Sequence, residues 1–145
     1  MKLKFKVDVD KKLIKGLTRA VENQAEKAVS VVAQDLARTA SETAPHFTGD
    51  LEDSYHIAYH SRNQKYYADI DFAVYHQGFN YAIAMHEWYY DLGIYSELKD
   101  GGTGMSGANY PVGRKYLTRV LEGEAQTYAD YISTKIKKAL ERGRR

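Results

Sequence analysis

The residues of this chain best suited to catalysis are the pair His86-Glu87. In the zinc motif His-Glu-x-x-His, two imidazoles lie one helical turn apart and bind the metal, while the glutamate acts as a base. The second histidine should follow Glu87 by three residues, but Tyr90 occupies that position. The motif is therefore broken, and a structural role for His86 is favoured over metal catalysis.

Other histidines and carboxylates are weaker candidates. His56 and His60 lie on one expected strand, roughly 13 Å apart, which is too far for them to chelate one ion. Asp69 and Asp71 share a face of another expected strand, where acid–base chemistry would require burial to separate their pKa values. A solvated strand face is the favoured interpretation. We therefore expect a protein that is not an enzyme and needs no metal or cofactor.

Two further patterns could bind phosphate groups. Gly101-Gly102-Thr103-Gly104 has the glycines of a phosphate loop but lacks the preceding strand and the following lysine and helix, so a flexible loop explains it better. Residues 135–145 are rich in lysine and arginine and could contact DNA phosphates. Cations at a helix C-terminus also interact favourably with the helix dipole, and we favour that interpretation.

The composition is typical of a globular protein, with 43% hydrophobic and 28% charged residues among 145. We expect a single domain over residues 1–145, with an extended loop at about residues 88–112. No apolar run approaches the roughly 20 residues that cross a membrane, and the alternating N-terminus is not expected to be a signal peptide. The chain has no cysteine, which excludes disulfides and thiolate chemistry.

The net charge of +2 hides an uneven distribution. Residues 1–19 and residues 135–145 each carry a charge of +5, whereas the 115 residues between them carry −8. A domain that reads DNA usually gathers positive charge on one face, so this arrangement does not favour one. The chain also has 13 tyrosines, a residue type that is enriched where proteins meet.

The hydrophobic periodicity predicts an α+β fold. We expect a small antiparallel sheet of three to four strands, flanked by a long N-terminal helix and a long C-terminal helix. The expected helices cover residues 11–43 and the stretch from Val112 to about residue 142. The expected strands cover residues 2–9, 55–60 and 66–75, and the segment 81–87 is ambiguous.

A turn at residues 44–54 separates the first helix from the strands. Pro45 should end the helix, because it has no amide hydrogen and restricts Ala44 to extended conformations. Gly49 supplies a flexible turn position, and the neighbouring Thr48 and Asp50 can cap nearby amides. The residues expected to build this structural turn are Pro45, Thr48, Gly49, Leu51 and Ser54.

The loop at residues 88–112 combines several glycines with tryptophan and tyrosine residues. Long loops without secondary structure are usually functional or disordered. We expect this loop to be mobile in an isolated subunit and to become ordered when its aromatic residues are buried on a partner. The candidate subunit contacts are Trp88, Tyr89, Tyr90, Tyr95 and Tyr110.

Three motifs follow one another along the chain. The first is Ala-Pro-x-x-Thr-Gly-x-Leu-x-x-Ser at residues 44–54. The second is Tyr81-Ala82 followed by His86-Glu87, and the third is Gly113-Arg114-Lys115-Tyr116-Leu117. In this order they resemble the tail-completion or head–tail connector (neck, minor capsid) proteins of long-tailed bacteriophages, in which the third motif begins the last helix. The loop at residues 88–112 is long for the family.

The resemblance implies a structural virion protein that forms a ring in the phage neck and joins the DNA-filled head to the tail. Its implied partners are copies of itself, neighbouring neck and tail-tube proteins, and packaged DNA that passes through the lumen without sequence-specific binding. Its implied location is the head–tail interface of the virion, after assembly in the host cytoplasm. The alternatives are a nucleic-acid-binding protein and a small metal-dependent hydrolase.

Overall fold

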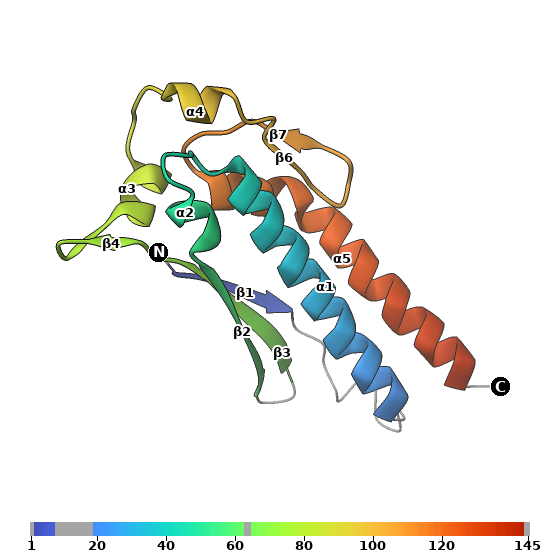
Figure 1. Cartoon of the computed structure of the whole chain (residues 1–145). Coiled ribbons are helices and arrows are strands. Elements are labelled where there is room, and N and C mark those ends of the chain that lie inside the picture. Colours follow the sequence, from blue (N-terminus) through green and yellow to red (C-terminus); the bar gives the residue numbers. More distant parts are fainter. Residues whose placement is uncertain (1, 8–18, 63–64, 144–145) are drawn as a thin grey trace.

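Two long helices dominate the computed structural model, which describes residues 2–7, 19–62 and 65–143 (Figure 1). Helix α1 spans Arg19–Thr43, and helix α5 spans Tyr116–Gly143. The end of α1 agrees with the stop predicted from Pro45. The predicted start of α1, at residues 11–18, lies outside the described residues.

A three-stranded antiparallel sheet with the order β1-β3-β2 packs beside α1. Strands β2 (Tyr55–Arg62) and β3 (Lys65–Phe72) are neighbours, and β1 (Lys2–Val7) pairs with the other edge of β3. The alternation predicted for β3 is confirmed, because Ala68, Ile70 and Phe72 are fully buried. The strand ends at Phe72, three residues before the predicted end. The α+β fold class is confirmed.

Helix α1 is central, because it contacts both the sheet and α5 (Figure 1). Burial on two sides requires a wide apolar stripe. Many residues of this stripe are small, so the sheet and α5 can pack closely against α1. Each fully buried Val or Leu side chain contributes about 1.5–3 kcal/mol relative to an exposed one. The buried core residues of α1 are Val21, Ala25, Ala28, Val29, Val32, Ala33, Leu36, Ala37 and Ala40.

Helix α5 packs on α1 along the apolar stripe predicted for it. It begins at Tyr116, later than the predicted Val112, because Lys115 has a positive φ of 57° that no helix accommodates. Tyr116 is fully buried, and its ring meets the edge of Phe72 at 5.4 Å between centroids. Its hydroxyl donates to the Ala82 carbonyl at 2.9 Å, so the start of α5 is fixed to both the sheet and helix α3 (Tyr81–Glu87).

The segment between β3 and α3 is a tight hairpin. Strands β4 (Tyr75–His76) and β5 (Phe79–Asn80) are joined by Gln77 and Gly78, whose φ values of 51° and 80° match a type I′ turn. The ambiguous segment that follows is helix α3, Tyr81–Glu87. Its first turn is capped by Asn80, whose side chain accepts from the Ala82 amide at 3.1 Å.

Residues 88–112 contradict the prediction of an irregular loop. They contain helix α4 (Ile94–Glu97) and a hairpin of β6 (Gly102–Thr103) with β7 (Asn109–Tyr110). The turn before β2 likewise contains one helical turn, α2 (Asp50–Asp53). Periodicity could not reveal these elements, because each is shorter than the repeat that a pattern needs to become visible.

The glycines of this segment allow close packing as well as flexibility. A Cβ on Gly102 would lie 2.5 Å from the Thr39 carbonyl oxygen and 2.7 Å from the Thr43 hydroxyl, both on α1. A Cβ on Gly104 would collide with the carboxylate of Glu124 on α5. The hairpin thus rests on both long helices of its own subunit. The mobility expected of this loop in an isolated subunit stays a prediction.

Replacing Gly102 with Ala should destabilise the protein by about 2 kcal/mol or more, because the backbone of α1 cannot yield to the added methyl group. Gly93→Ala is the matched control, since a Cβ there meets nothing within 4 Å and its φ is −76°. Urea unfolding of the three proteins measures the difference. Equal stability of Gly102→Ala and Gly93→Ala would contradict the close packing of the hairpin.

Candidate functional site

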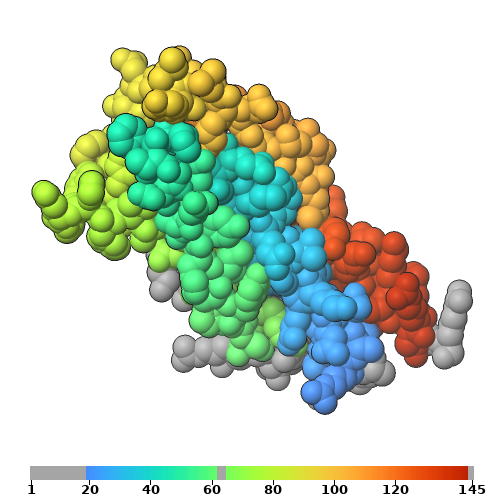
Figure 2. Space-filling model, in the orientation of Figure 1, coloured from blue at the N-terminus to red at the C-terminus, as the bar shows by residue number. Residues whose placement is uncertain are grey.

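Large apolar side chains are exposed at one end of the molecule, on two segments that we call the end surface: residues 46–53 and 88–100. The exposed fractions reach 73% for Phe47, 86% for Tyr89, 67% for Ile94 and 74% for Leu98. In Figure 1 the end surface lies around α2 and α4, far from the C-terminus of α5. Figure 2 shows residues 88–100, in yellow, as a projecting edge of the molecule.

The predicted contact residues divide into two groups. Trp88, Tyr89 and Tyr95 are 56%, 86% and 59% exposed and belong to the end surface. Tyr90 donates its hydroxyl to the Met85 carbonyl at 2.5 Å, and Tyr110 donates to Glu124 at 2.7 Å. These last two hydroxyls serve the fold of the subunit.

The turn at residues 44–54 holds the first segment of the end surface in place. Gly49 has a φ of 91°, which fits the flexible position predicted for it. Leu51 is buried in the core beneath the turn, and Ser54 donates its hydroxyl to the Leu51 carbonyl at 2.7 Å. The Thr48 hydroxyl lies 3.4 Å from the Asp50 amide, and Pro45 is buried.

Ser96 joins the second segment of the end surface to the first. Its hydroxyl accepts from the His46 amide at 2.9 Å and donates to the His46 carbonyl at 3.1 Å. The ring of His46 meets the edge of Tyr95 at 6.3 Å between centroids, and its Nδ1 lies 2.7 Å from a carboxylate oxygen of Glu52. Exposed aromatic residues are thus carried on a backbone that is fixed from within.

Lys99 completes this connection at the C-terminal end of α1. Its ammonium group donates to the Ala44 carbonyl at 2.5 Å and to the Ser41 carbonyl at 3.4 Å, and lies 3.5 Å from the Glu52 carboxylate. Burial lowers the pKa of Lys99, while the negative charge of Glu52 opposes this shift. A cation here satisfies helix carbonyls that have no partner within α1 and complements the helix dipole.

Other aromatic side chains pack beside the end surface. The ring of Trp88 lies 5.5 Å from that of Phe79 on the β4–β5 hairpin. The guanidinium of Arg114 lies 3.9 Å from the centroid of Tyr89, a cation–π contact, and donates to the Glu87 carbonyl at 3.0 Å. The β4–β5 hairpin and the start of α5 therefore border the end surface.

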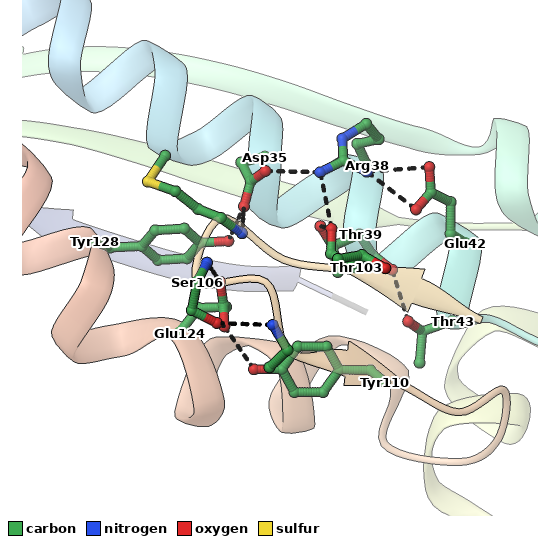
Figure 3. Close-up of polar contacts among 12 residues, drawn as sticks. Asp35, Arg38, Thr39, Glu42, Thr43, Thr103, Ser106, Tyr110, Glu124 and Tyr128 are labelled. Carbon is green, nitrogen blue, oxygen red and sulfur yellow. Dashed lines mark hydrogen bonds and ion pairs between the residues drawn. The ribbon is translucent and has the colours of Figure 1, made fainter. Parts of the chain in front are cut away.

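The hairpin of β6 and β7 is anchored by the buried Glu124 of α5 (Figure 3). This carboxylate accepts from the Ser106 amide at 2.7 Å, from the Ser106 hydroxyl at 2.5 Å and from the Tyr110 hydroxyl at 2.7 Å. Burial acts to raise the pKa of Glu124, but the bonds from Ser106 and Tyr110 outweigh it and lower the pKa below its ordinary value. Burial, together with Glu124, raises the pKa of Tyr110 to about 12.

A second carboxylate, Asp35 of α1, holds the other side of the hairpin (Figure 3). It accepts from the Tyr128 hydroxyl at 2.7 Å, from the Met105 amide at 3.1 Å and from Arg38 at 2.7 Å. Asp35 and Glu124 are therefore committed to donors of their own chain. Sequence reasoning missed this cluster, although a glutamate within the apolar stripe of α5 was a visible signal of a buried carboxylate.

The glycines at positions 101–104 leave no cradle for a phosphate. The space beside Gly102 holds Thr39 and Thr43, and the space beside Gly104 holds the acidic side chain of Glu124. A carboxylate repels a phosphate group, so the local chemistry opposes nucleotide binding. These glycines serve close packing instead.

The pair His86-Glu87 is structural in this arrangement. His86 is 2% exposed, with Nδ1 3.0 Å from Glu87 and Nε2 3.2 Å from the Thr118 hydroxyl. Nδ1 donates to the carboxylate and Nε2 accepts from Thr118, so both ring nitrogens are engaged. Burial lowers the pKa of His86, opposed in part by Glu87, and the ring is neutral at neutral pH. Glu87 also pairs with Lys115.

The interpretation of a solvated strand face is wrong for Asp69. This residue is only 8% exposed, because the ring of His60 on β2 lies against it, with Nε2 of His60 3.2 Å from the carboxylate. The ring of His60 also stacks on Tyr67 at 5.0 Å. Asp71 is half-buried and lies opposite His56 in the register. Within the described residues, no group of three or more side chains is placed to bind a metal ion.

Residues 8–85 match the protein family described as "Bacteriophage HK97-gp10, putative tail-component". The match covers more than half of the chain. The chain belongs to the HK97-gp10-like family. No curated protein and no solved structure matches it.

The family confirms the phage resemblance drawn from the motif at residues 44–54, and makes the HK97-gp10-like chain a tail-related structural protein of the virion. The matched residues include α1, the turn, the β2–β3 pair and most of α3. The second segment of the end surface and α5 follow the matched region. Within the described residues, each helix is too short or too polar to cross a lipid bilayer.

Replacing Lys99 with Met should cost about 1–3 kcal/mol of stability, because the Ala44 carbonyl and the Glu52 carboxylate lose a buried partner. Lys27→Met, at an exposed position of α1, is the control and should stay within about 0.5 kcal/mol of the wild type. Thermal unfolding measures both. A Lys99→Met protein as stable as the control would contradict the capping role.

Replacing Glu124 with Gln should destabilise the protein at neutral pH by about 1–3 kcal/mol, and hydrogen exchange should become faster at residues 102–110. The pKa of Glu124 is lower in the folded chain than its ordinary value of 4.5. Its stabilisation is therefore present above pH 4.5 and is lost as the pH falls through the folded pKa.

The stability difference between the wild type and Glu124→Gln should consequently shrink on acidification. Glu122→Gln, an exposed position on the same helix, is the control and should show no such convergence. A difference that stays constant from neutral pH to below pH 4 would show that Glu124 is not an ionised anchor.

Proposed function

We propose that this HK97-gp10-like chain forms a ring in the phage neck and joins the DNA-filled head to the tail. The observation that carries the proposal is the end surface, which exposes Phe47, Tyr89, Ile94, Tyr95 and Leu98 together on a fixed backbone. Exposed apolar patches of this kind mark sites where proteins meet. Tyrosine and tryptophan supply large contact area at low entropic cost.

The internal contacts beneath the end surface support a role in assembly. Ser96 and Lys99 fix the backbone of this segment to the end of α1, so little order has to be gained when a partner binds. A preformed surface loses less conformational entropy on association than a mobile loop. In the proposed ring the end surface contacts other copies of the chain, and the surface of the ring that stays exposed is available to neck and tail-tube proteins.

The two alternative functions gain no support from the described residues. A metal-dependent hydrolase would need free ligands, but both ring nitrogens of His86 are engaged and Asp35 and Glu124 are occupied by donors. For a nucleic-acid-binding protein, the described cations are spread over several elements, among them Lys27 and Arg38 on α1, Arg114 before α5 and the last turns of α5, and the end surface is acidic. In the proposed ring, DNA passes through the lumen without sequence-specific contact, because like charges on the protein keep it from adhering.

A nonsense mutation in the gene for this chain, in the phage that encodes it, should abolish infectious particles while filled heads and free tails accumulate. Electron microscopy of lysates measures this outcome. Supplying the wild-type chain from a plasmid should restore joined particles, and Lys27→Met should restore them equally. Joined, infectious particles made without the chain would contradict the proposed head–tail role.

A further inference from the structure

The end surface is acidic as well as apolar. Residues 46–53 and 88–100 hold six carboxylates and a single lysine. That lysine, Lys99, donates its ammonium group to the carbonyls at the end of α1 and is largely buried. The carboxylates that remain exposed among the apolar side chains are those of Asp50, Asp53, Asp91, Glu97 and Asp100.

The last turns of α5, residues 135–142, carry the opposite charge. We call them the basic end of α5. They hold four cations, Lys135, Lys137, Lys138 and Arg142, and one carboxylate, Glu141. Lys137, Lys138 and Arg142 are exposed, and Lys135 lies 5.4 Å from the centroid of the Tyr131 ring. Ile136 and Leu140 are half-buried, and Ile136 packs against the core of its own subunit, so the free apolar area of the basic end is that of the lysine side-chain stems.

The two surfaces lie at opposite ends of one subunit, with the end surface near α4 and the basic end of α5 beside the C-terminus (Figures 1 and 2). The basic end of α5 therefore cannot contact the end surface of its own subunit. Contact between two different patches on identical subunits is heterologous, and repeated with a suitable rotation it closes into a ring. Contact of the end surface with itself would instead bring carboxylates together, which is repulsive.

We propose that the basic end of α5 of one copy docks on the end surface of the next copy. This inference rests on the ring proposed above and specifies its subunit contact. The lysines and Arg142 of the basic end face the carboxylates of Glu97, Asp100 and Asp91, while the apolar stems of these lysines cover exposed side chains of α4. Opposite charges select this orientation, and apolar burial supplies affinity.

Charge reversal tests the contact. One variant reverses the basic end with Lys137→Glu and Lys138→Glu, and a second reverses the end surface with Glu97→Lys and Asp100→Lys. All four positions are exposed, so the fold should survive, and circular dichroism with thermal unfolding verifies this. The matched controls are Lys27→Glu and Glu122→Lys, which reverse exposed charges outside residues 46–53, 88–100 and 135–142.

Sedimentation velocity at low ionic strength measures self-association over a range of concentrations. Each double variant should weaken association at least about tenfold, while the two controls should associate like the wild type. Mixing the two variants should restore association, because each variant then offers a complementary surface to the other. Combining all four substitutions in one chain should restore it as well.

Three outcomes would overturn the inference: a wild-type chain that stays monomeric, a basic-end variant that associates normally, or variants that weaken association without rescue on mixing. The head–tail role is tested separately by the nonsense mutant. Free heads and tails without the chain, together with failed charge rescue, would leave the proposed function standing and remove only this subunit contact. Joined particles without the chain would remove the function itself.

Discussion

The free carbonyl groups at the C-terminal end of α1 are the constraint on which the rest of the structure depends. Pro45 prevents the helix from continuing, so these carbonyls need donors from elsewhere in the chain. The Lys99 ammonium group donates to the Ser41 and Ala44 carbonyls, and the Gly113 amide donates to the Thr43 carbonyl at 3.1 Å. One helix end thereby fixes α4, the connection to α5 and the turn before the sheet.

This arrangement explains how an exposed aromatic surface is compatible with an ordered backbone. The side chains of Ser96 and Lys99 point inward and bind the turn, while those of Tyr95, just before Ser96, and Leu98, just before Lys99, remain exposed. Polar contacts thus hold the segment, and apolar area stays free for a partner. The alternation of inward polar and outward apolar residues is the reverse of an ordinary surface helix.

Much of the framework was predictable from the sequence, because the spacing of apolar residues in a long helix or strand indicates which of its faces is buried. The stripes of α1 and α5, the alternation of β2 and β3 and the stop at Pro45 all depend on local pattern. The hairpin of β6 and β7 was not predictable, because its order comes from Glu124 and Asp35, which are distant in sequence from Ser106 and Met105. Its glycines indicated flexibility, whereas Gly102 allows close contact with α1. The exposed tyrosines were predicted as a class, but which ones face inward is a property of the packed structure.

A cryo-electron microscopy reconstruction of the joined head–tail region of the assembled phage tests the central claim most directly. We predict a closed ring of this chain at the junction, with residues 88–100 of each subunit covered by the last turns of α5 from the next. A junction built without this chain, or a ring in which Tyr89, Tyr95 and Leu98 all face solvent, would contradict it.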